Sequence, residues 1–590
     1  DTKKLFCECN STIQEKKPDY TIERKLRAVV GETGEIDIAA AQEALKGKTH
    51  IYEAYDENCC LIELDEEPPR KLREEALSIA IQLGKLMKTK FVDEVQVMRK
   101  TVIDGSNTTG FQRTALVGYD GKIETSQGKV TIPTILIEED AARPIKEETD
   151  KITWRLDRLG IPLLEISTGP DIKTPEHCAE TAEKIGLLLR STGKVKRGLG
   201  TIRQDVNVSI EGGQRVEIKG AQDLKLIPKW VELEAQRQEK LLEIKKELEK
   251  REVKEVYAQI VDVSRLLKNS KSKIIETTLK KGGAVLGIKL PCFKGLIGKE
   301  IQPKRRLGTE FSDRAKVSAR VGGIFHSDEL PNYGILPDEV EQISKHLDCG
   351  NHDAFVIVAD TKEKSEKALQ AVIIRANDAI KGVPKEVRKP NEDGTTTFMR
   401  LMPGAARMYP ETDVLPIKLT KEMLEVELPE LIEHKIKRYE KMGIGADLAE
   451  LTAKSEKAAL FDQFVKSFKT LKPAYIAEIL MTAERTIKRQ FNIEITPTDE
   501  DYCTLFTALE HDEISKESVL DILKENKPVK TVLNKYKTLA EGELLRELTK
   551  IIEQNKGAPP NALMGKAMAQ LRGKASGQKI AELLKKLAKG

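Results

Sequence analysis

The chain has 590 residues, with 99 Lys and Arg against 95 Asp and Glu, and its formal net charge is +4. This near balance excludes a polycation of the histone type, so any surface for nucleic acid must be local. A hydrophobic content of 39% excludes a wholly disordered chain. Only 4% of the residues are aromatic, which disfavours a protein that binds nucleic acid mainly by base stacking. The length predicts three to five domains. With no signal peptide and no membrane-length apolar run, we expect a cytoplasmic protein.

The first 260 residues mix short strands with helices. Strands are expected within 101–104, 111–119, 130–140, 200–210 and 214–220. The helix expected over 70–90 follows Pro68-Pro69, and the helix expected over 175–192 has Thr174 as its N-cap, Pro175 at its first position and Gly193 after its end.

The composition and the expected secondary structure change twice along the rest of the chain. The charged segment 228–257 predicts a solvated amphipathic helix, with a coiled coil as the less favoured alternative. Residues 283–388 are richer in Gly and strand-like runs, and from residue 420 the chain is almost entirely helical. The last 35 residues hold eight Lys and Arg against Glu582 alone, which predicts a local basic surface.

The segment 201–219 predicts a β-hairpin with one apolar and one charged face. A three-residue loop over 211–213 matches the apolar faces of both strands and suits a left-handed glycine. This register sets Asp205 opposite Lys219 and Asn207 opposite Glu217. The charged face is either part of an active site or a solvent-facing salt-bridge surface.

Two further charged segments favour an active site. An apolar strand ends in Glu138-Glu139-Asp140, and carboxylates at a strand end suit Mg²⁺, although an exposed acidic turn is the commoner arrangement. Residues 154–167 place Asp157, Arg158 and Glu165 around an apolar stretch. Three such segments within 90 residues indicate one active-site sheet.

Four cysteines near the N-terminus suggest a metal site. Cys7, Cys9, Cys59 and Cys60 could form a four-thiolate zinc site. Adjacent cysteines rarely bind the same ion, so ordinary reduced thiols are the favoured alternative.

The sequence contains no motif for glutamine hydrolysis and no motif for a phosphate-binding loop. The sequence lacks GxxxxGK[ST], the Ser-rich amidase signature and GxSxG. Asp393-Gly394-Thr395 is similar to an asparaginase nucleophile motif, but its flanks predict a hairpin turn.

Long motifs carry a resemblance to a known family. FCEC, IEEDAARP, LDRLGIPLLEISTGPDI, GTIRQDVNVSI and VEIKG have the order and spacing of the GatB/GatE family, the activating subunits of tRNA-dependent amidotransferases. Residues 283–388 resemble an insert shared with bacterial-type aspartyl-tRNA synthetase, and NALMGKAMAQLRGKASGQKIAELLKKL is similar to the family's YqeY-like tail.

The resemblance implies an α+β multidomain fold with a mainly antiparallel-sheet catalytic cradle. It implies cradle residues 1–282 and 389–428, an α+β insert over 283–388, a helical domain over 429–497 and a tRNA-binding tail over 498–590.

It also implies a ligase activity. ATP and Mg²⁺ would phosphorylate the side-chain carboxylate of glutamate misacylated onto tRNA(Gln), and ammonia would displace the phosphate to give Gln-tRNA(Gln). An asparaginase-like glutaminase, the D component of the amidotransferase, would be the partner that supplies ammonia.

The implied site residues fall into four groups. Mg²⁺ ligands would be Glu139, which is also catalytic, with Glu165 and Glu217. Arg158 and Lys219 would act on phosphate, with Asp205 orienting Lys219. Glu138, Arg203 and Asn207 would bind ATP. The tail would bind tRNA through Lys566, Arg572, Lys574 and Lys579.

Two departures from the family pattern bear on the metal sites. A Gly-Leu-Glu-x-His motif is expected upstream of Asp1, and its Glu and His contribute to the family's metal site. Zinc-bearing members use two separated CxxC-like pairs, from which Cys59-Cys60 departs.

Two other functions would explain part of the sequence. A non-catalytic tRNA-binding adaptor would explain the basic tail and the insert, but it has no use for clustered carboxylates. A free-standing aspartyl-tRNA synthetase relative would need synthetase motifs outside the insert, and these are missing.

Overall fold

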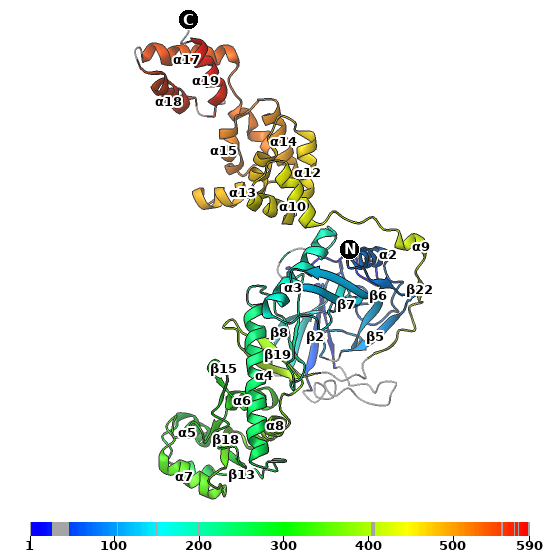
Figure 1. Cartoon of the computed structure of the whole chain (residues 1–590), viewed down its shortest axis with the longest axis vertical. Coiled ribbons are helices and arrows are strands. Elements are labelled where there is room, and N and C mark those ends of the chain that lie inside the picture. Colours follow the sequence, from blue (N-terminus) through cyan, green and yellow to red (C-terminus); the bar gives the residue numbers. More distant parts are fainter. Residues whose placement is uncertain are drawn as a thin grey trace. The chain divides into compact units, whose positions relative to one another are not determined.

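The computed structural model describes residues 2–25, 47–102, 104–148, 150–196, 198, 200–402, 408–555, 558–571, 573–575 and 577–587. The chain forms two compact units, residues 1–428 and 429–590 (Figure 1). Among the described residues, all strands belong to the first unit and the second is helical. This arrangement confirms the predicted α+β class with mainly antiparallel sheets and an all-helical C-terminal part.

The largest sheet of the first unit has the strand order β10-β7-β6-β5-β21, with β3 also paired to β6. Its strands are β3 (Lys90–Phe91), β5 (Val97–Thr101), β6 (Phe111–Thr125), β7 (Gly128–Glu139), β10 (Pro162–Ile166) and β21 (Met408–Pro410). Strand β6 includes the predicted strand 111–119, and β7 includes the predicted strand 130–140 except its last residue, Asp140. Helix α2 (Glu74–Leu86) buries Leu77 and Ile81 against Val117 and Ile137 of this sheet.

A second sheet has the order β1-β2-β9-β8. Its strands are β1 (Tyr20–Arg24), β2 (Thr49–Ala54), β8 (Arg143–Glu147) and β9 (Lys151–Arg155). The parallel pair β2–β9 buries Tyr52 and Trp154 in one core. Two small sheets pair β4 (Glu94–Val95) with β22 (Ile417–Lys418) and β15 (Glu300–Gln302) with β16 (Arg305–Arg306).

The charged hairpin belongs to a third sheet, with the order β11-β12-β19-β20. Its strands are β11 (Val206–Val208), β12 (Val216–Ile218), β19 (Glu386–Pro390) and β20 (Thr396–Leu401). Asn207 lies opposite Glu217 and Gly212 has φ +75°, which confirms the predicted register and left-handed glycine. Both strands are shorter than predicted, and the backbone before β11 bonds instead through the Gln204 carbonyl to the Ala221 N–H.

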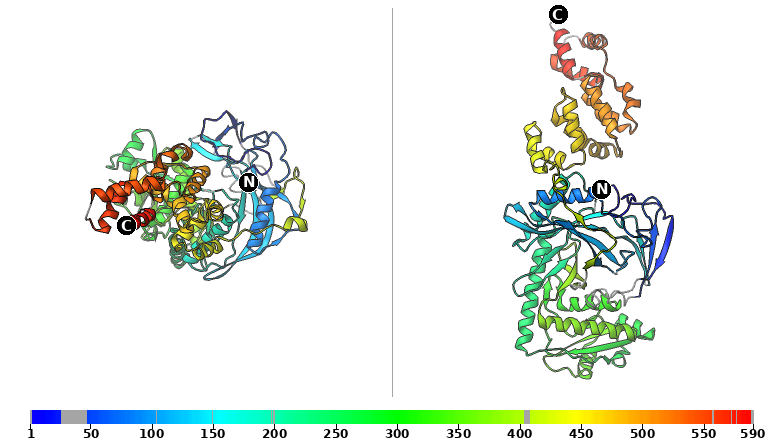
Figure 2. Two further views of the ribbon diagram at one scale, coloured as in Figure 1. Left: turned by 90° about the horizontal axis from the view of Figure 1, so that it is seen from above. Right: turned by 90° about the vertical axis from the view of Figure 1, so that its right-hand side faces the viewer.

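The predicted helices of the first unit are present with shifted ends. Helix α3 (Pro175–Ser191) is capped by the Thr174 hydroxyl, which accepts from the His177 N–H, as expected. Helix α4 (Ile227–Lys250) is not a simple solvated helix, because Leu241, Ile244 and Leu248 are buried in the core of the insert. It runs from the sheets to the insert helices α6 and α8 (Figures 1 and 2).

A fourth sheet, with the order β13-β14-β18-β17, joins three strands of the predicted insert 283–388 to the preceding strand β13. Its strands are β13 (Val261–Asp262), β14 (Ala284–Leu290), β17 (Phe325–His326) and β18 (Ala354–Asp360). The predicted insert contains the helices α6 (Leu307–Ala319), α7 (Pro337–His346) and α8 (Lys362–Lys381), and the 3₁₀ turn η1 (Ser264–Leu267) and helix α5 (Lys273–Lys280) precede it. One hydrophobic core joins β14 and β18 to α4, α6 and α8.

A buried ionic network joins α4, α6, α8 and β19. The fully buried guanidinium of Arg237 lies 2.6 Å from a Glu310 carboxylate oxygen and 3.3 Å from a Glu386 oxygen. Arg375 and Arg388 complete the pairing of these two carboxylates. Such a network fixes the relative position of its elements, because removal of one charge leaves the remaining buried charges incompletely compensated.

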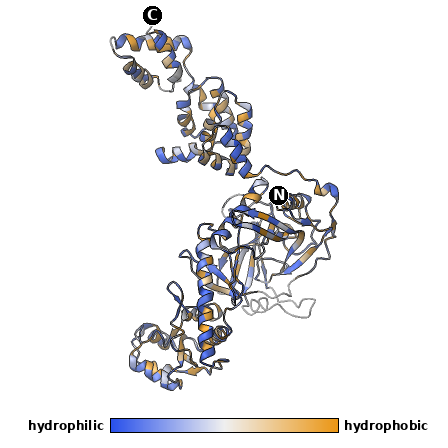
Figure 3. Cartoon of the chain, in the orientation of Figure 1, coloured by the Kyte–Doolittle hydropathy of each residue, from blue (hydrophilic) through white to orange (hydrophobic). Residues whose placement is uncertain are grey.

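The second unit consists of amphipathic helices (Figure 3). They are α10 (Ile432–Lys441), α11 (Ala446–Lys454), α12 (Ala458–Ser467), α13 (Pro473–Phe491), α14 (Asp499–Glu510), η2 (Lys516–Ser518), α15 (Val519–Lys524), α16 (Val529–Val532), η3 (Leu533–Tyr536), α17 (Glu541–Gln554), α18 (Pro560–Gln570) and α19 (Gly577–Leu587). Helix α9 (Lys421–Leu424) belongs to the first unit. None of the described helices is long and apolar enough to span a membrane.

Candidate functional site

A large cavity of about 2380 Å³ lies within the first unit. Strands of three sheets, helix α3 and the ends of the insert helices α6 and α8 line it. Among the described residues, its lining includes fourteen Lys and Arg against eight Asp and Glu. The cavity therefore attracts anions, although it contains carboxylates of its own.

A pair of carboxylates lies on one wall of the cavity. Glu138 at the end of β7 and Glu165 on β10 share the ammonium group of Lys100 on β5, at 2.7 Å and 3.7 Å. Glu138 is buried, whereas about half of the Glu165 side chain is exposed toward the cavity. Two carboxylates and one ammonium leave this wall with a net negative charge.

The environment of Glu165 changes its protonation. Burial and the neighbouring negative charge of Glu138 raise the pKa of Glu165 to about 7, although Lys100 opposes the change. The side chain is thus close to half protonated at neutral pH, and a divalent cation beside it would favour the charged form.

Guanidinium groups line the adjoining wall. Arg203 lies 2.9 Å from one oxygen of Asp140, and Arg158 lies 3.7 Å from the other. Arg158 also donates to the Ala141 and Ala142 carbonyls at 2.8 and 3.0 Å. Burial and the neighbouring Arg203 lower the pKa of Arg158 from its usual range. The two cations share one carboxylate, so this wall keeps an excess positive charge suited to phosphate.

The hairpin β11–β12 presents its charged face to the same cavity. Lys219 lies 3.2 Å from Asp205 and 3.6 Å from Glu217. Asn207 lies opposite Glu217 in the ladder. The structure therefore brings Asp205, Asn207, Glu217 and Lys219 together, as the hairpin register predicted.

Glu139, the leading magnesium ligand of the sequence analysis, is not among the residues that line the large cavity. Its carboxylate accepts from the Arg113 guanidinium at 3.2 Å and from the Arg113 backbone N–H at 3.1 Å. It lines a separate small pocket beside Phe6 and Glu63. Successive residues of a strand point to opposite faces, so Glu138, and not Glu139, meets Glu165 in the cavity. The structure places Glu139 beside Arg113 and outside the lining of the large cavity, and its part in metal binding stays a prediction.

The chain is similar to known proteins over its whole length. Residues 1–425 match the family model of the GatB/GatE catalytic domain. The chain belongs to the GatB/GatE family. A Methanocaldococcus jannaschii protein, named as the E component of glutamyl-tRNA(Gln) amidotransferase, is 47% identical over 100% of this chain and 96% of its own. Proteins of the same name are 47% identical in Thermococcus gammatolerans, over 99% and 96% of the two chains, and 51% identical in Pyrococcus furiosus, over 89% and 84%.

The family resemblance implies Mg²⁺, and the carboxylate pair fits this ion. Mg²⁺ prefers carboxylate oxygens and usually keeps several waters, which an open cavity wall allows. Glu138 and Glu165 would hold it, because their mutual repulsion is only partly relieved by Lys100. Glu217 lines the same cavity from another sheet, so its part in metal binding stays a prediction.

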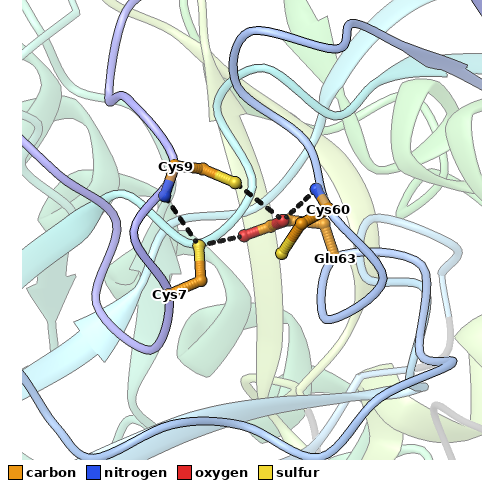
Figure 4. A group of neighbouring side chains, drawn as sticks. All are labelled: Cys7, Cys9, Cys60 and Glu63. Carbon is orange, nitrogen blue, oxygen red and sulfur yellow. Dashed lines mark hydrogen bonds between the residues drawn. The ribbon is translucent and has the colours of Figure 1, made fainter.

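The N-terminal cysteines form a second cluster, shown in Figure 4. Possible ligand atoms of Cys7, Cys9, Cys60 and Glu63 lie within 4.8 Å of one another. The Cys7 thiol donates to a Glu63 oxygen at 2.8 Å, and the Cys60 N–H donates to the other at 2.8 Å. Hydrogen bonding from the other two thiols lowers the pKa of Cys60, whereas hydrogen bonding to Cys60 raises the pKa of Cys7 and of Cys9, so the three thiols act as one group.

This cluster fits zinc better than the four cysteines first considered. Cys59 lies outside it, and the carboxylate of Glu63 takes the fourth place. Three thiolates and one carboxylate are ligands that Zn²⁺ accepts in tetrahedral sites. The spacing Cys60-x-x-Glu63 mirrors a CxxC pair, a signal that the sequence analysis missed.

The predicted tRNA-binding residues lie in the second unit. Lys566 is exposed on α18, Lys579 is exposed on α19, and Lys574 is exposed in the loop between these helices. Arg572 lies outside the described residues. The exposed ammonium groups are compatible with phosphate contacts, and their role stays a prediction.

Lys100 is another residue of the candidate site that sequence reasoning missed. It is one of several lysines in the region, and no local motif marks it. Its position beside Glu138 follows from the pairing of β5 with β6 and of β6 with β7. Correct registers for both pairs would have been needed to find it.

Proposed function

We propose that the cavity activates the side chain of glutamate attached to tRNA(Gln) with ATP and Mg²⁺, and that ammonia then converts it to glutamine. The name shared by the relatives supplies the substrate. The supporting observation is the carboxylate pair Glu138–Glu165 beside the Arg158–Arg203 guanidiniums in one cavity. A non-catalytic adaptor would need only the cations.

The first step transfers a phosphoryl group. An oxygen of the substrate carboxylate attacks the γ-phosphorus of ATP, the bond from that phosphorus to the β,γ-bridging oxygen breaks, and ADP leaves with its electrons. Arg158 and Arg203 stabilise the charge on the phosphate oxygens, and Lys219, oriented by Asp205, adds a further cation. Mg²⁺ bound by Glu138 and Glu165 would neutralise phosphate charge.

The second step forms the amide. Ammonia attacks the carbonyl carbon of the acyl phosphate, phosphate leaves with the electrons of the C–O bond, and the nitrogen loses a proton. A carboxylate is a poor electrophile, so the phosphate leaving group makes this attack possible.

Ammonia would come from a partner, an asparaginase-like glutaminase that corresponds to the D component of the amidotransferase. The one DGT triplet of this chain lies in the turn between β19 and β20, and the Asp393 carboxylate accepts from the N–H and hydroxyl of Thr395 at 2.9 and 2.7 Å. Thr395 is almost fully buried. A buried hydroxyl engaged in a turn is unsuited to act as a nucleophile.

The purified chain tests this proposal with Glu-tRNA(Gln), ATP and either ammonium or glutamine. Ammonium should give Gln-tRNA(Gln) and ADP, and glutamine should give neither product. Glutamine hydrolysis that persists in the Asp393→Ala/Thr395→Ala variant would contradict the assignment of ammonia production to a partner. Loss of hydrolysis in that variant would show instead that the triplet is a nucleophile.

A further inference from the structure

The sheet that carries the hairpin β11–β12 has one side toward the cavity and the other in the protein interior. Glu217 and Lys219 line the cavity. Val216 and Ile218, the residues that precede them, are fully buried in hydrophobic cores. β12 pairs in parallel with β19, with Ile218 beside Arg388, and the Lys219 N–H donates to the Arg388 carbonyl at 2.9 Å. The backbone of Arg388 therefore sets where Lys219 leaves the strand.

The position of Arg388 depends on its side chain, because the ladder of β19 is irregular at this point. The pairing of β19 with β20 shifts register between Val387 and Arg388. The buried Arg388 guanidinium donates to the Thr396 hydroxyl at 2.7 Å and to the Thr396 carbonyl at 2.9 Å, which ties it to β20. It also lies 2.5 Å from Glu386 and 3.2 Å from Glu310. Where the ladder is interrupted, these side-chain contacts position the strand.

Glu310 is the contribution of the predicted insert to this arrangement. Its buried carboxylate on α6 binds three buried guanidiniums, those of Arg237 at 2.6 Å, Arg375 at 2.5 Å and Arg388 at 3.2 Å. Within the described residues, Arg375 pairs with no other carboxylate. Without the charge of Glu310, the three cations would have only two other buried carboxylates between them, and their repulsion would move them apart. The charge of one insert residue thus holds Arg388 in its present position.

We propose that Glu310 is a positioning residue for the reaction: through Arg388 it fixes the end of β12 and hence the ammonium group of Lys219. This inference rests on the proposed function, which assigns Lys219 to the phosphate. The ammonium lies 3.2 Å from Asp205 and 3.6 Å from Glu217, and a shift of the backbone would disturb both contacts. A misplacement of about 1 Å can lower a rate by about a hundredfold. Through this residue, the insert would act on the chemistry from beneath the sheet, without touching the substrate.

Helix α6 offers a matched control for this role. Asp313, one turn after Glu310, is also buried and pairs with Arg305 rather than with a residue of β19. Glu310→Gln and Asp313→Asn each neutralise one buried carboxylate of the same helix with little change in its size. Only Glu310→Gln removes a charge that binds Arg388. A general loss of stability would affect both variants alike.

The first measurement is hydrogen–deuterium exchange of the full chain, read by mass spectrometry on the peptide that contains β12 and Lys219. Glu310→Gln should speed exchange in this peptide by about tenfold relative to β7, and Asp313→Asn should leave it as in the wild type. Melting temperatures show whether both variants are folded. If Glu310→Gln does not fold, Glu310→Asp, which keeps the charge on a shorter side chain, takes its place with the same expected pattern.

The second measurement is a double-mutant cycle on the rate of acyl phosphate formation in single turnovers. Glu310→Gln should lower this rate by about tenfold and leave the tRNA affinity unchanged. In a Lys219→Ala background it should cause no further loss, because it acts through Lys219. Additive losses, or equal exchange in the two α6 variants, would overturn the proposal. If the wild type forms no acyl phosphate, the proposed function fails, and the exchange comparison alone decides whether Glu310 holds Lys219 in place.

Discussion

Glu138 and Glu139 are consecutive residues whose carboxylates lie on opposite faces of one sheet. Glu138 pairs with Lys100 at 2.7 Å in the large cavity, and Glu139 pairs with Arg113 at 3.2 Å on the other face. Arg113 also binds the buried Glu411 at 2.9 Å. The two acids of one motif therefore have different environments, and we expect different effects when each is changed.

Replacing Glu138 by Gln should abolish ATP-dependent phosphorylation of the tRNA-linked glutamate, because the carboxylate pair loses a member. Replacing Glu139 by Gln should leave phosphorylation within a few-fold of wild type. It should lower the free energy of unfolding by roughly 1–3 kcal/mol, because a buried charged hydrogen bond is removed. Single-turnover assays and urea unfolding measure the two effects. Loss of chemistry in a stable Glu139→Gln protein would contradict this assignment.

Magnesium binding should depend on pH through Glu165. Its pKa of about 7 means that the carboxylate gains its charge as the pH rises through neutrality. The Mg²⁺ affinity, measured by calorimetry, should therefore increase between pH 6 and pH 8 and then level off. The Glu165→Gln variant should bind more weakly with a flat profile over this range. An unchanged affinity in that variant would exclude Glu165 as a ligand.

The cysteine cluster should hold one zinc ion for each chain. Cys60→Ser should remove it, because one of four ligands is missing, whereas Cys59→Ser should retain it, because Cys59 lies outside the cluster. Elemental analysis of the purified variants measures the zinc content. Equal zinc in both variants would contradict the ligand set.

The buried ionic network should make the first unit sensitive to acid. Burial alone would raise the pKa of Glu310, but Arg237, Arg375 and Arg388 outweigh it and hold the pKa well below its usual range. The pKa of Glu386 is also lowered, by Arg388 and Arg237 acting against burial. The unfolded pKa is about 4.3, so this stabilisation is present above that pH and is lost as the pH falls through the lower folded values. Urea unfolding from pH 7 to pH 2.5 should show the loss.

Two substitutions on helix α4, one inside the buried ionic network and one outside it, test whether the network stabilises the first unit. Arg237→Met should cost about 3–5 kcal/mol at pH 7, since it removes a buried cation that pairs with Glu234, Glu310 and Glu386 and leaves these buried carboxylates incompletely compensated. Lys240→Met, on the same helix but in an exposed pair with Glu243, should leave the stability close to that of the wild type. Similar effects of both substitutions would show that the network does not stabilise the unit.

The tail should bind tRNA through its phosphates. Replacing Lys566, Lys574 and Lys579 by Ala should weaken binding and reduce the salt slope by about three, because each substitution removes one cation from a phosphate. Binding of ATP should not change, because these residues belong to the second unit. Unchanged tRNA affinity at several salt concentrations would contradict this role.

The sequence alone was sufficient to predict the features that depend on local geometry. Alternation along a strand and the length of its loop predicted the pairing of Asn207 with Glu217 and the contact of Asp205 with Lys219. The cap at Thr174 and the turn at Asp393 likewise depend on neighbours within a few residues. Long motifs were sufficient to identify the family.

Only the tertiary structure decided which of these groups meet. Lys100 and Glu138 are 38 residues apart, and Cys7 and Glu63 are 56 apart. The choice between Glu138 and Glu139 depended on which face of β7 is turned toward the cavity. The periodicity of a strand is a property of its own backbone, whereas the face it presents to a site is set by pairing with distant strands, which local sequence does not encode.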